Sequence, residues 1–399
     1  MTSLTFLPSA VVKMKSLLLA LFLSSALLPA FAQTQGTAPL APLAPVPPHL
    51  DARAWLLLDT SGNQILSSEK PDMRAEPASL TKLMTAYVVF NALKSKSITL
   101  DQTVPVSESA WRMVKSGSAM FIEPRKPVTV RELLQGVIVQ SGNDACIALA
   151  ELVAGTEANF VMLMNREAQR LGLANTQFRN ATGLTESGHY SSPRDMATIA
   201  AAIIRDHADF FPIYSQKEFR YNKINQPNRN RLLWLDPTVD GMKTGHTDAA
   251  GYCLVSTARR GPRRLISVVM GTASDNARTL ASQQLLNFGF LSFDSVRFYA
   301  ANQPVRKLQV WQGQQDEVEV GVGQDLVLAV PRDRSKDVKL QFDAAPLIKA
   351  PLAKGSQLGR LTLSLDGKSL GEFPVIALQD VAQAGIVGRS VDAVKLWFR

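Results

Sequence analysis

The chain has 399 residues, of which 46% are hydrophobic and 19% charged, and this composition excludes an intrinsically disordered protein and predicts two or three folded domains. Lys and Arg total 43 against 34 Asp and Glu, and the net charge of +9 alone does not distinguish nucleic acid, an anionic membrane or an acidic substrate as partner. Two Cys, and four His without metal-binding spacing, argue against a disulfide scaffold and a zinc hydrolase, so we expect no metal.

The N-terminal segment has the composition of a secretory signal. A basic stretch at 13–15 precedes an apolar run at 16–28, and Ala-Phe-Ala at 30–32 provides a small-residue cleavage site. We therefore predict a signal peptide over residues 1–32, with an uncleaved anchor as the alternative. The Pro- and Ala-rich residues 33–48 predict a linker. Export from the cytoplasm would exclude nucleic acid as a partner.

The next 248 positions, 49–296, mix strand and helix patterns. Apolar runs around turn residues predict paired strands, and capping signals with 3.6-residue periodicity predict helices between them. The expected strands lie within 54–66, 251–258 and 264–271, and the expected helices follow Pro77, Thr129 and Ser192 or cover 145–154 and 276–288. This order predicts an α/β (α+β) domain, with helices packed on a sheet.

The last hundred residues divide into two parts. Residues 297–383 alternate apolar and polar positions and contain the hairpin signal Asp366-Gly367, so we predict a small all-β sandwich domain. Residues 384–399 predict a short amphipathic helix. Its apolar stripe would consist of Val387, Val391, Val394 and Phe398, and its basic residues would be Arg389, Lys395 and Arg399. We expect this helix to lie on a membrane surface, while docking on its own domain remains the alternative.

Short motifs in the chain are compatible with a serine hydrolase that uses Lys as its base. Ser-x-x-Lys places the two side chains on one helix face, and it occurs at Ser67 and at Ser79. Ser79 opens an apolar helix in which Lys82 would be desolvated and its pKa lowered, so the context favours Ser79.

Two further motifs complete the pattern. Ser-x-Asn occurs at Ser61, Ser141 and Ser274, and only Ser141-Gly-Asn143 lies between two apolar helices. Lys-[Ser/Thr]-Gly occurs at 115–117 and at 243–245, and the second copy directly precedes the strand pair. The order Ser79, Ser141, Lys243 is the signature of penicillin-binding proteins and serine β-lactamases.

Longer segments carry a closer resemblance. SLTKLMTAYVVF, SGNDACIALAELVAG, NATGL, YSSPRDMATIA, NRNRLLW and VDGMKTGHTDAAGYCLV resemble the low-molecular-mass penicillin-binding proteins that are D-alanyl-D-alanine carboxypeptidases. The similarity runs from about Ala54 to the C-terminus. It implies a DD-peptidase-like catalytic domain, an antiparallel sheet with helices on both sides, followed by the β domain and the anchoring helix.

The resemblance also implies roles for individual residues. Ser79 would attack the bond between two D-alanines of a peptidoglycan pentapeptide, Lys82 would accept its proton, and Ser141 would relay a proton to the leaving amine. Asn143 would hold the substrate amide and Lys82. The substrate would be bound by Lys243, Thr244, Gly245, His246, Arg194 and Arg278. Of these, Lys243, Thr244, Arg194 and Arg278 would receive the free carboxylate. The backbone amides of Ser79 and His246 would form the oxyanion hole.

The resemblance further implies a partner set and a location. The protein would need no cofactor, would bind β-lactams as inhibitors, and would act at the periplasmic side of the inner membrane in cell-wall biogenesis and cell-shape maintenance. A β-lactamase or a peptidoglycan DD-endopeptidase on the same active site remains an alternative, and penicillin is expected to leave slowly.

Overall fold

The computed structural model describes residues 45–397. The predicted signal peptide at 1–32 and the linker as far as 44 lie outside the described residues, as do Phe398 and Arg399 of the predicted tail helix.

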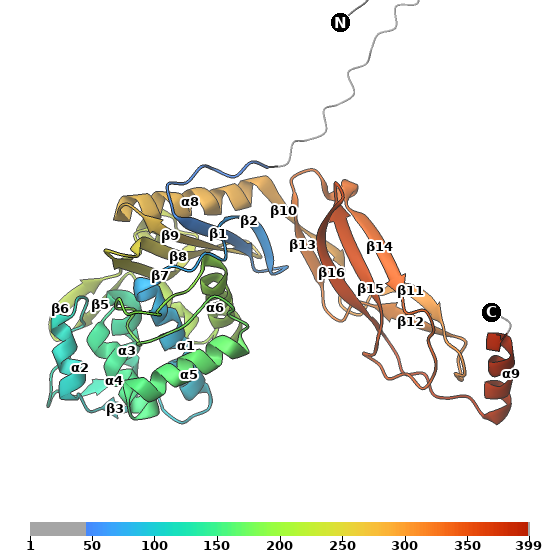
Figure 1. Cartoon of the computed structure of the whole chain (residues 1–399), viewed down its shortest axis with the longest axis horizontal. Coiled ribbons are helices and arrows are strands. Elements are labelled where there is room, and N and C mark those ends of the chain that lie inside the picture. The colour runs from blue at the N-terminus through green and yellow to red at the C-terminus, as the bar shows by residue number, and fades with distance from the viewer. Residues whose placement is uncertain (1–44, 398–399) are drawn as a thin grey trace, which may run out of the picture. The chain divides into compact units, whose positions relative to one another are not determined.

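A five-stranded antiparallel sheet forms the base of the N-terminal domain (Figure 1). Its order is β2-β1-β9-β8-β7, so strands from the start of the domain pair with strands from its end. The bounds are β1 Ala54–Asp59, β2 Gln64–Glu69, β7 Val239–Thr247, β8 Gly251–Arg260 and β9 Arg263–Thr272. The strand pairs predicted at 54–66 and 251–271 are confirmed.

Both faces of this sheet are covered, because successive side chains on a strand point to opposite sides. Leu57 and Val269 pack in one core with Leu285 of α8 (Asp275–Ser292), whereas Leu56 and Val268 belong to the core of the helical part. The expected sheet with helices on both sides is thus confirmed.

The helical part lies between β2 and β7 in the chain. Its main elements are η1 Ala78–Thr81, α1 Lys82–Lys94, α2 Glu108–Arg112, η2 Met113–Lys115, α3 Val130–Gln135, η3 Gly136–Gln140, α4 Asn143–Ala154, α5 Glu157–Arg170, α6 Pro193–Asp206, η4 Phe211–Ser215 and α7 Leu232–Leu235. Short hairpins are formed by β3 Thr103–Val104 with β4 Val128–Thr129, and by β5 Glu218–Tyr221 with β6 Ile224–Pro227. Nearly every side chain of α1 is buried, so this helix is the centre of the core.

The predicted helix starts agree with the structure. Thr129 and Glu132 form a capping box at α3, and Ser192 accepts a hydrogen bond from the Asp195 amide at the start of α6. α4 starts at Asn143, two residues before the predicted position, which places the whole Ser-Gly-Asn motif at its N-terminus.

The C-terminal domain is all-β. One sheet pairs β10 (Phe293–Tyr299) with β13 (Leu326–Pro331), and the second has the order β11-β12-β16-β15-β14. The other bounds are β11 Pro304–Gln309, β12 Glu317–Gly321, η5 Ser335–Asp337, β14 Lys339–Ala344, β15 Gln357–Leu365 and β16 Lys368–Ala377. Inward-facing Val and Leu side chains of both sheets form a separate core, as in a sandwich.

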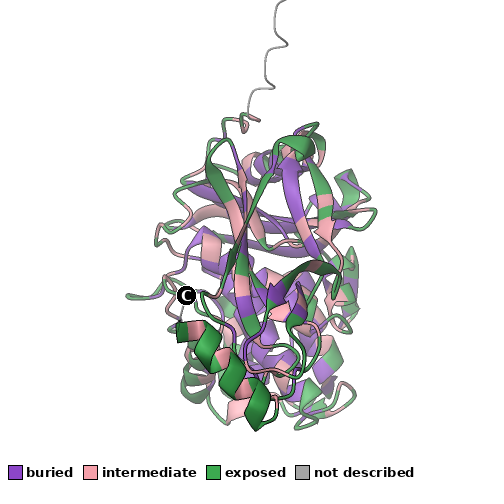
Figure 2. Cartoon of the chain, turned by 90° about the vertical axis from the view of Figure 1, so that its right-hand side faces the viewer, coloured by how far each residue is buried: buried purple, intermediate pink, exposed green. Residues whose placement is uncertain are grey.

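The chain continues into α9, Ile386–Trp397, whose surface is mostly exposed (Figure 2). Along the stretch from 45 to 397, no single helix is long and apolar enough to cross a membrane, and one bent pair, α4 with α5, meets the length and composition criteria only when taken together.

Candidate active site

A cavity of about 410 Å³ opens where the helical part meets the edge strand β7. Ser79, Ser141 and Asn143 line it from the helical side, and Thr244 to Thr247 line it from β7. Residues more than a hundred positions apart in the chain therefore converge on one volume of the size typical for small-ligand sites.

Ser79 and Lys82 face each other within this cavity region. Ser79 lies in the 3₁₀ turn η1 and Lys82 opens α1, so the three-residue spacing places both side chains on one side of the helix. The Lys82 Nζ donates to Ser79 Oγ at 2.8 Å. A lysine amine at this distance can accept the proton of the serine hydroxyl once the amine is neutral.

Burial makes the neutral form of Lys82 accessible. Its side chain is only 1% exposed, and desolvation is the main cause that lowers its pKa to about 8, with the positive charge of Arg229 acting in the same direction. Nζ also donates to Asn143 Oδ1 at 2.8 Å and to the Thr182 carbonyl at 2.7 Å. The amine is thus fixed in position while its proton affinity is reduced.

The Ser-Gly-Asn motif supplies a second hydroxyl. The π-helical turn η3 ends at Ser141, which adopts a left-handed conformation (φ 68°) that is uncommon for a non-glycine residue. Ser141 Oγ is buried and has no hydrogen-bond partner within residues 45–397. Such an arrangement costs stability, and it leaves the hydroxyl available to a ligand.

The Lys-Thr-Gly motif lies on β7, which is an edge strand, so part of its backbone has no strand partner. At Gly245 a Cβ atom would lie 2.9 Å from the Pro77 carbonyl and 3.2 Å from the Ser79 amide nitrogen. Glycine is therefore required for β7 to approach the serine this closely. The next residue, His246, is exposed at the cavity and its ring lies 4.0 Å from that of Tyr252.

Lys243 adds a second buried ammonium. Its side chain is 2% exposed, and its pKa lies well below the ordinary value because of burial first, then the positive charges of Lys82 and Arg229. Since the charge of Lys82 contributes to the lowered pKa of Lys243, the two amines lie close enough to interact.

Two arginines line the cavity on the β7 side, Arg278 and Arg229. Arg278, predicted from the sequence, is buried and donates to the Gly245 carbonyl at 3.0 Å. Arg229 was not among the predicted site residues, although it belongs to the NRNRLLW segment that carried the resemblance. Desolvation by the surrounding protein, and then the charge of Arg278, lower the pKa of Arg229.

Arg194 is not brought into this cavity. Its guanidinium forms two hydrogen bonds with Asp72, at 2.7 and 3.0 Å, in an exposed ion pair outside the cavity lining. The second Ser-x-x-Lys motif, Ser67 to Lys70, lies on and after the edge strand β2 and does not line the cavity either.

The cavity lining includes a loop that the sequence analysis did not assign to the site. Lys-Ser-Gly at 115–117 was passed over in favour of the copy at 243–245, yet Ser116, Gly117 and Ser118 line the cavity. Asn143 holds this loop, because its Nδ2 donates to the Ser116 carbonyl and its amide to the Ser118 carbonyl, both at 2.7 Å. Because Asn143 bonds to backbone carbonyls, these contacts require no particular side chain in the loop, and the loop sequence contains no motif that predicts them.

Thr182, Gly183 and Leu184, from the NATGL segment, complete the lining. A Cβ atom at Gly183 (φ 83°) would lie 1.9 Å from the Ala78 carbonyl, so only glycine permits this approach to the turn that carries Ser79.

Class A β-lactamases use a Glu-x-x-x-Asn loop to activate the deacylating water. The spacing occurs in this chain at Glu218 and Asn222, but both residues belong to the β5–β6 hairpin and neither lines the cavity. Among residues 45–397, no group of three or more His, Cys, Asp or Glu side chains is arranged to hold a metal ion.

A serine next to a desolvated lysine, in a domain whose sheet has helices on both faces, is the arrangement expected of a serine acyl-transfer hydrolase with a lysine base. A family model described as D-alanyl-D-alanine carboxypeptidase matches residues 41–274, and one described as the C-terminal domain of penicillin-binding protein 5 matches residues 293–383. The chain belongs to the D-alanyl-D-alanine carboxypeptidase family and is a serine peptidase.

Similar proteins cover both domains. The chain is 43% identical over 357 residues to the D-alanyl-D-alanine carboxypeptidase DacC of Escherichia coli, covering 88% of this chain and 89% of that protein. The crystal structure of penicillin-binding protein 5 from Haemophilus influenzae is 42% identical, with a TM-score of 0.81, and covers 85% of this chain and 99% of the other. Penicillin-binding protein 6B from Escherichia coli is 36% identical with a TM-score of 0.70 over 84% of this chain and 97% of the other.

Proposed function

We propose that Ser79 is the nucleophile and Lys82 its base in the removal of the terminal D-alanine from peptidoglycan pentapeptides. The 2.8 Å contact between Lys82 Nζ and Ser79 Oγ, made by an amine whose pKa is lowered to about 8, is the observation that carries this assignment. Neutral Lys82 accepts the hydroxyl proton as Oγ attacks the carbonyl carbon and forms a tetrahedral intermediate. The C–N bond to the terminal D-alanine then breaks, D-alanine leaves as the amine, and water hydrolyses the acyl-enzyme that remains.

Ser141 relays a proton to the leaving D-alanine. Its buried hydroxyl has no partner in the described chain and lines the same cavity, which supports this role. Asn143 orients Lys82 through Oδ1 and binds the substrate amide. The developing oxyanion is stabilised by the backbone amides of Ser79 and His246, which the edge position of β7 and the closeness of Gly245 to Ser79 support.

The free carboxylate of the substrate is bound on the β7 side. The resemblance assigned this role to Lys243, Thr244 and Arg278. Thr244 and Arg278 line the cavity, whereas Lys243 is buried and does not line it; Arg229 joins the group because it lines the same cavity. Arg194 is left out of this group, since its guanidinium is paired with Asp72. A cavity that presents several cations to one end of a peptide favours a free C-terminus over an internal bond.

Covalent labelling tests the assignment of the nucleophile. We expect fluorescent penicillin to label the wild-type protein and to leave Ser79→Ala unlabelled. The matched control is Ser67→Ala, which removes the serine of the other Ser-x-x-Lys motif and should still be labelled. Circular dichroism establishes that each variant is folded. Labelling of folded Ser79→Ala would show that another residue is the nucleophile. Rapid, sustained turnover of a chromogenic cephalosporin would instead favour the β-lactamase alternative.

We also propose that the mature protein acts at the periplasmic face of the inner membrane. The signal-like residues 1–32, the linker 33–48, the catalytic domain 49–296 and the β domain 297–383 would precede a surface anchor at 384–399. In support, the apolar residues Val387, Val391 and Val394 of α9 are exposed, as expected of a helix whose apolar face is covered by lipid.

A further inference from the structure

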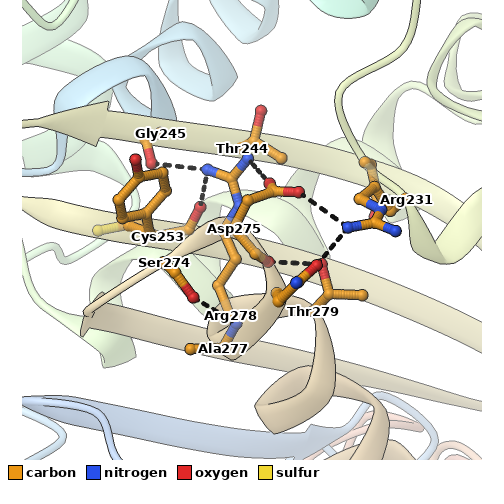
Figure 3. Close-up of polar contacts among 12 residues, drawn as sticks. Arg231, Thr244, Gly245, Cys253, Ser274, Asp275, Ala277, Arg278 and Thr279 are labelled. Carbon is orange, nitrogen blue, oxygen red and sulfur yellow. Dashed lines mark hydrogen bonds and ion pairs between the residues drawn. The ribbon is translucent and has the colours of Figure 1, made fainter.

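The guanidinium of Arg278 is held by the protein on more than one side (Figure 3). Nη1 donates to the carbonyls of Gly245, at 3.0 Å, and Cys253, at 3.4 Å, and the group lies over the ring of Tyr252 at 5.4 Å. These contacts come from β7 and β8, so the position of Nη1 is fixed by the sheet alone. Nε has no hydrogen-bond partner among residues 45–397, so the group retains donor capacity.

Asp275, the first residue of α8, contacts the other end of the guanidinium. Its Oδ1 accepts a hydrogen bond from Arg278 Nη2, and the carboxylate is 37% exposed. Its Oδ2 lies 3.6 Å from Nη1 of Arg231, which is 52% exposed and also donates to the Asn276 side chain. The three charges therefore form a row from the cavity to solvent: cation, anion, cation (Figure 3).

The row has an electrostatic consequence for the cavity. Two carbonyls and an aromatic ring would still hold Arg278 if Asp275 were uncharged, so the carboxylate is not needed to anchor the guanidinium. What the carboxylate adds is a negative charge beside the cation, and it engages one N–H of Nη2, which leaves the guanidinium fewer donors for a ligand carboxylate.

We propose that Asp275 is a positioning residue that weakens the carboxylate-binding site, because it engages one N–H of Arg278 Nη2 and offsets the charge of that guanidinium. The proposal rests on the role of Arg278 as a receptor for the terminal carboxylate of the substrate. A weaker receptor favours release of the free D-alanine and of the shortened peptide, each of which ends in a carboxylate.

The expected change in carboxylate affinity is estimated from the loss of one unit charge, that of Asp275, next to a partly solvated guanidinium. Removing this charge changes the affinity for a carboxylate by about three- to tenfold at low salt. Asp275→Asn is the appropriate variant, since the amide oxygen can still accept from Nη2 while the charge is lost. Because Asp275 is partly exposed, the difference between the two proteins should shrink as salt is added.

The experiment compares two forms of one peptide, ending in D-Ala-D-Ala with a free carboxylate or with a C-terminal amide. We measure kcat and KM for both with the wild-type protein, Asp275→Asn, Arg278→Gln and Asp316→Asn. The last variant removes the same charge from an exposed position of the β domain and serves as the control. Thermal unfolding checks that each variant is folded.

We expect Asp275→Asn to lower KM for the free-acid peptide about three- to tenfold while the KM for the amide changes by much less. A purely structural role for Asp275 would alter both peptides alike. The informative quantity is the ratio of KM for the free-acid peptide to KM for the amide. If this ratio increases in Arg278→Gln but is unchanged or increased in Asp275→Asn, the role of Asp275 is overturned while that of Arg278 stands. An unchanged ratio in Arg278→Gln overturns the underlying assignment of Arg278, independently of Asp275.

Discussion

Protonation of Lys82 should control the rate of acylation. With a pKa of about 8, about one molecule in ten has a neutral Lys82 at pH 7, against about one in three thousand at the ordinary value of 10.5. Burial thus raises the concentration of the active base by about 300-fold. The second-order rate of acylation by penicillin should rise with pH and level off above a midpoint near pH 8.

Removing a neighbouring charge tests the cause of this pKa. The positive charge of Arg229 lowers the pKa of Lys82, so Arg229→Gln should move the midpoint of the pH profile upward by about 0.5 to 1 pH unit. Stopped-flow acylation measured from pH 5.5 to pH 10 in both proteins gives the two midpoints, independently of any change in affinity. A wild-type midpoint near 10, or a midpoint in Arg229→Gln that is unchanged or lower, would refute the reasoning.

Three other predictions concern the packing around the site, the acid stability and the tail. Gly183→Ala should abolish most penicillin labelling in a folded protein, because its Cβ would lie 1.9 Å from the Ala78 carbonyl; retention of full labelling would contradict the role assigned to this close approach. His207 is buried among aromatic rings, and neither of its ring nitrogens has a hydrogen-bond partner within residues 45–397. Burial lowers its pKa to about 4, so the stability that neutral His207 provides is complete above pH 6.5 and is lost as the pH falls toward 4. Between pH 7.5 and pH 5, the unfolding free energy of His207→Phe should therefore fall by about 2 kcal/mol less than that of the wild-type protein, as measured by urea titration. An unchanged pH dependence would argue against this cause. In the tail, Val391→Asp should release the protein from membranes into the soluble fraction while Ser390→Asp, which adds the same charge on a different side of α9, should not; equal behaviour of the two would contradict binding through the apolar face.

Local patterns were sufficient to select the residues that we propose to carry the chemistry. The Ser79 and Ser141 motifs lie at helix starts, where capping and periodicity can be read from a few neighbours. The Lys243 motif was placed directly before the predicted strand pair, and the structure adds β7, a strand that was not predicted, at this position. Their convergence was inferred from the order of the motifs and the resemblance, and the cavity confirms that Ser79, Ser141 and Thr244 meet.

Contacts between distant segments were not predictable in the same way. Arg194 was expected at the substrate because of the family resemblance, but Asp72, 122 positions earlier, pairs with its guanidinium. Ser116 is held at the cavity because Nδ2 of Asn143, 27 positions later, donates a hydrogen bond to the Ser116 carbonyl. Neither pairing leaves a periodic or compositional signal, since each joins residues on irregular or terminal positions of different elements.

The decisive measurement is the release of D-alanine from a peptidoglycan pentapeptide. We expect the wild-type protein to release one D-alanine per peptide and to stop once penicillin has attached one penicilloyl group to Ser79. We expect Lys82→Ala, folded but without the base, to release D-alanine far more slowly. Release that continues in a fully penicillin-labelled protein, or that is undiminished in Ser79→Ala or Lys82→Ala, would contradict the proposed roles of Ser79 and Lys82.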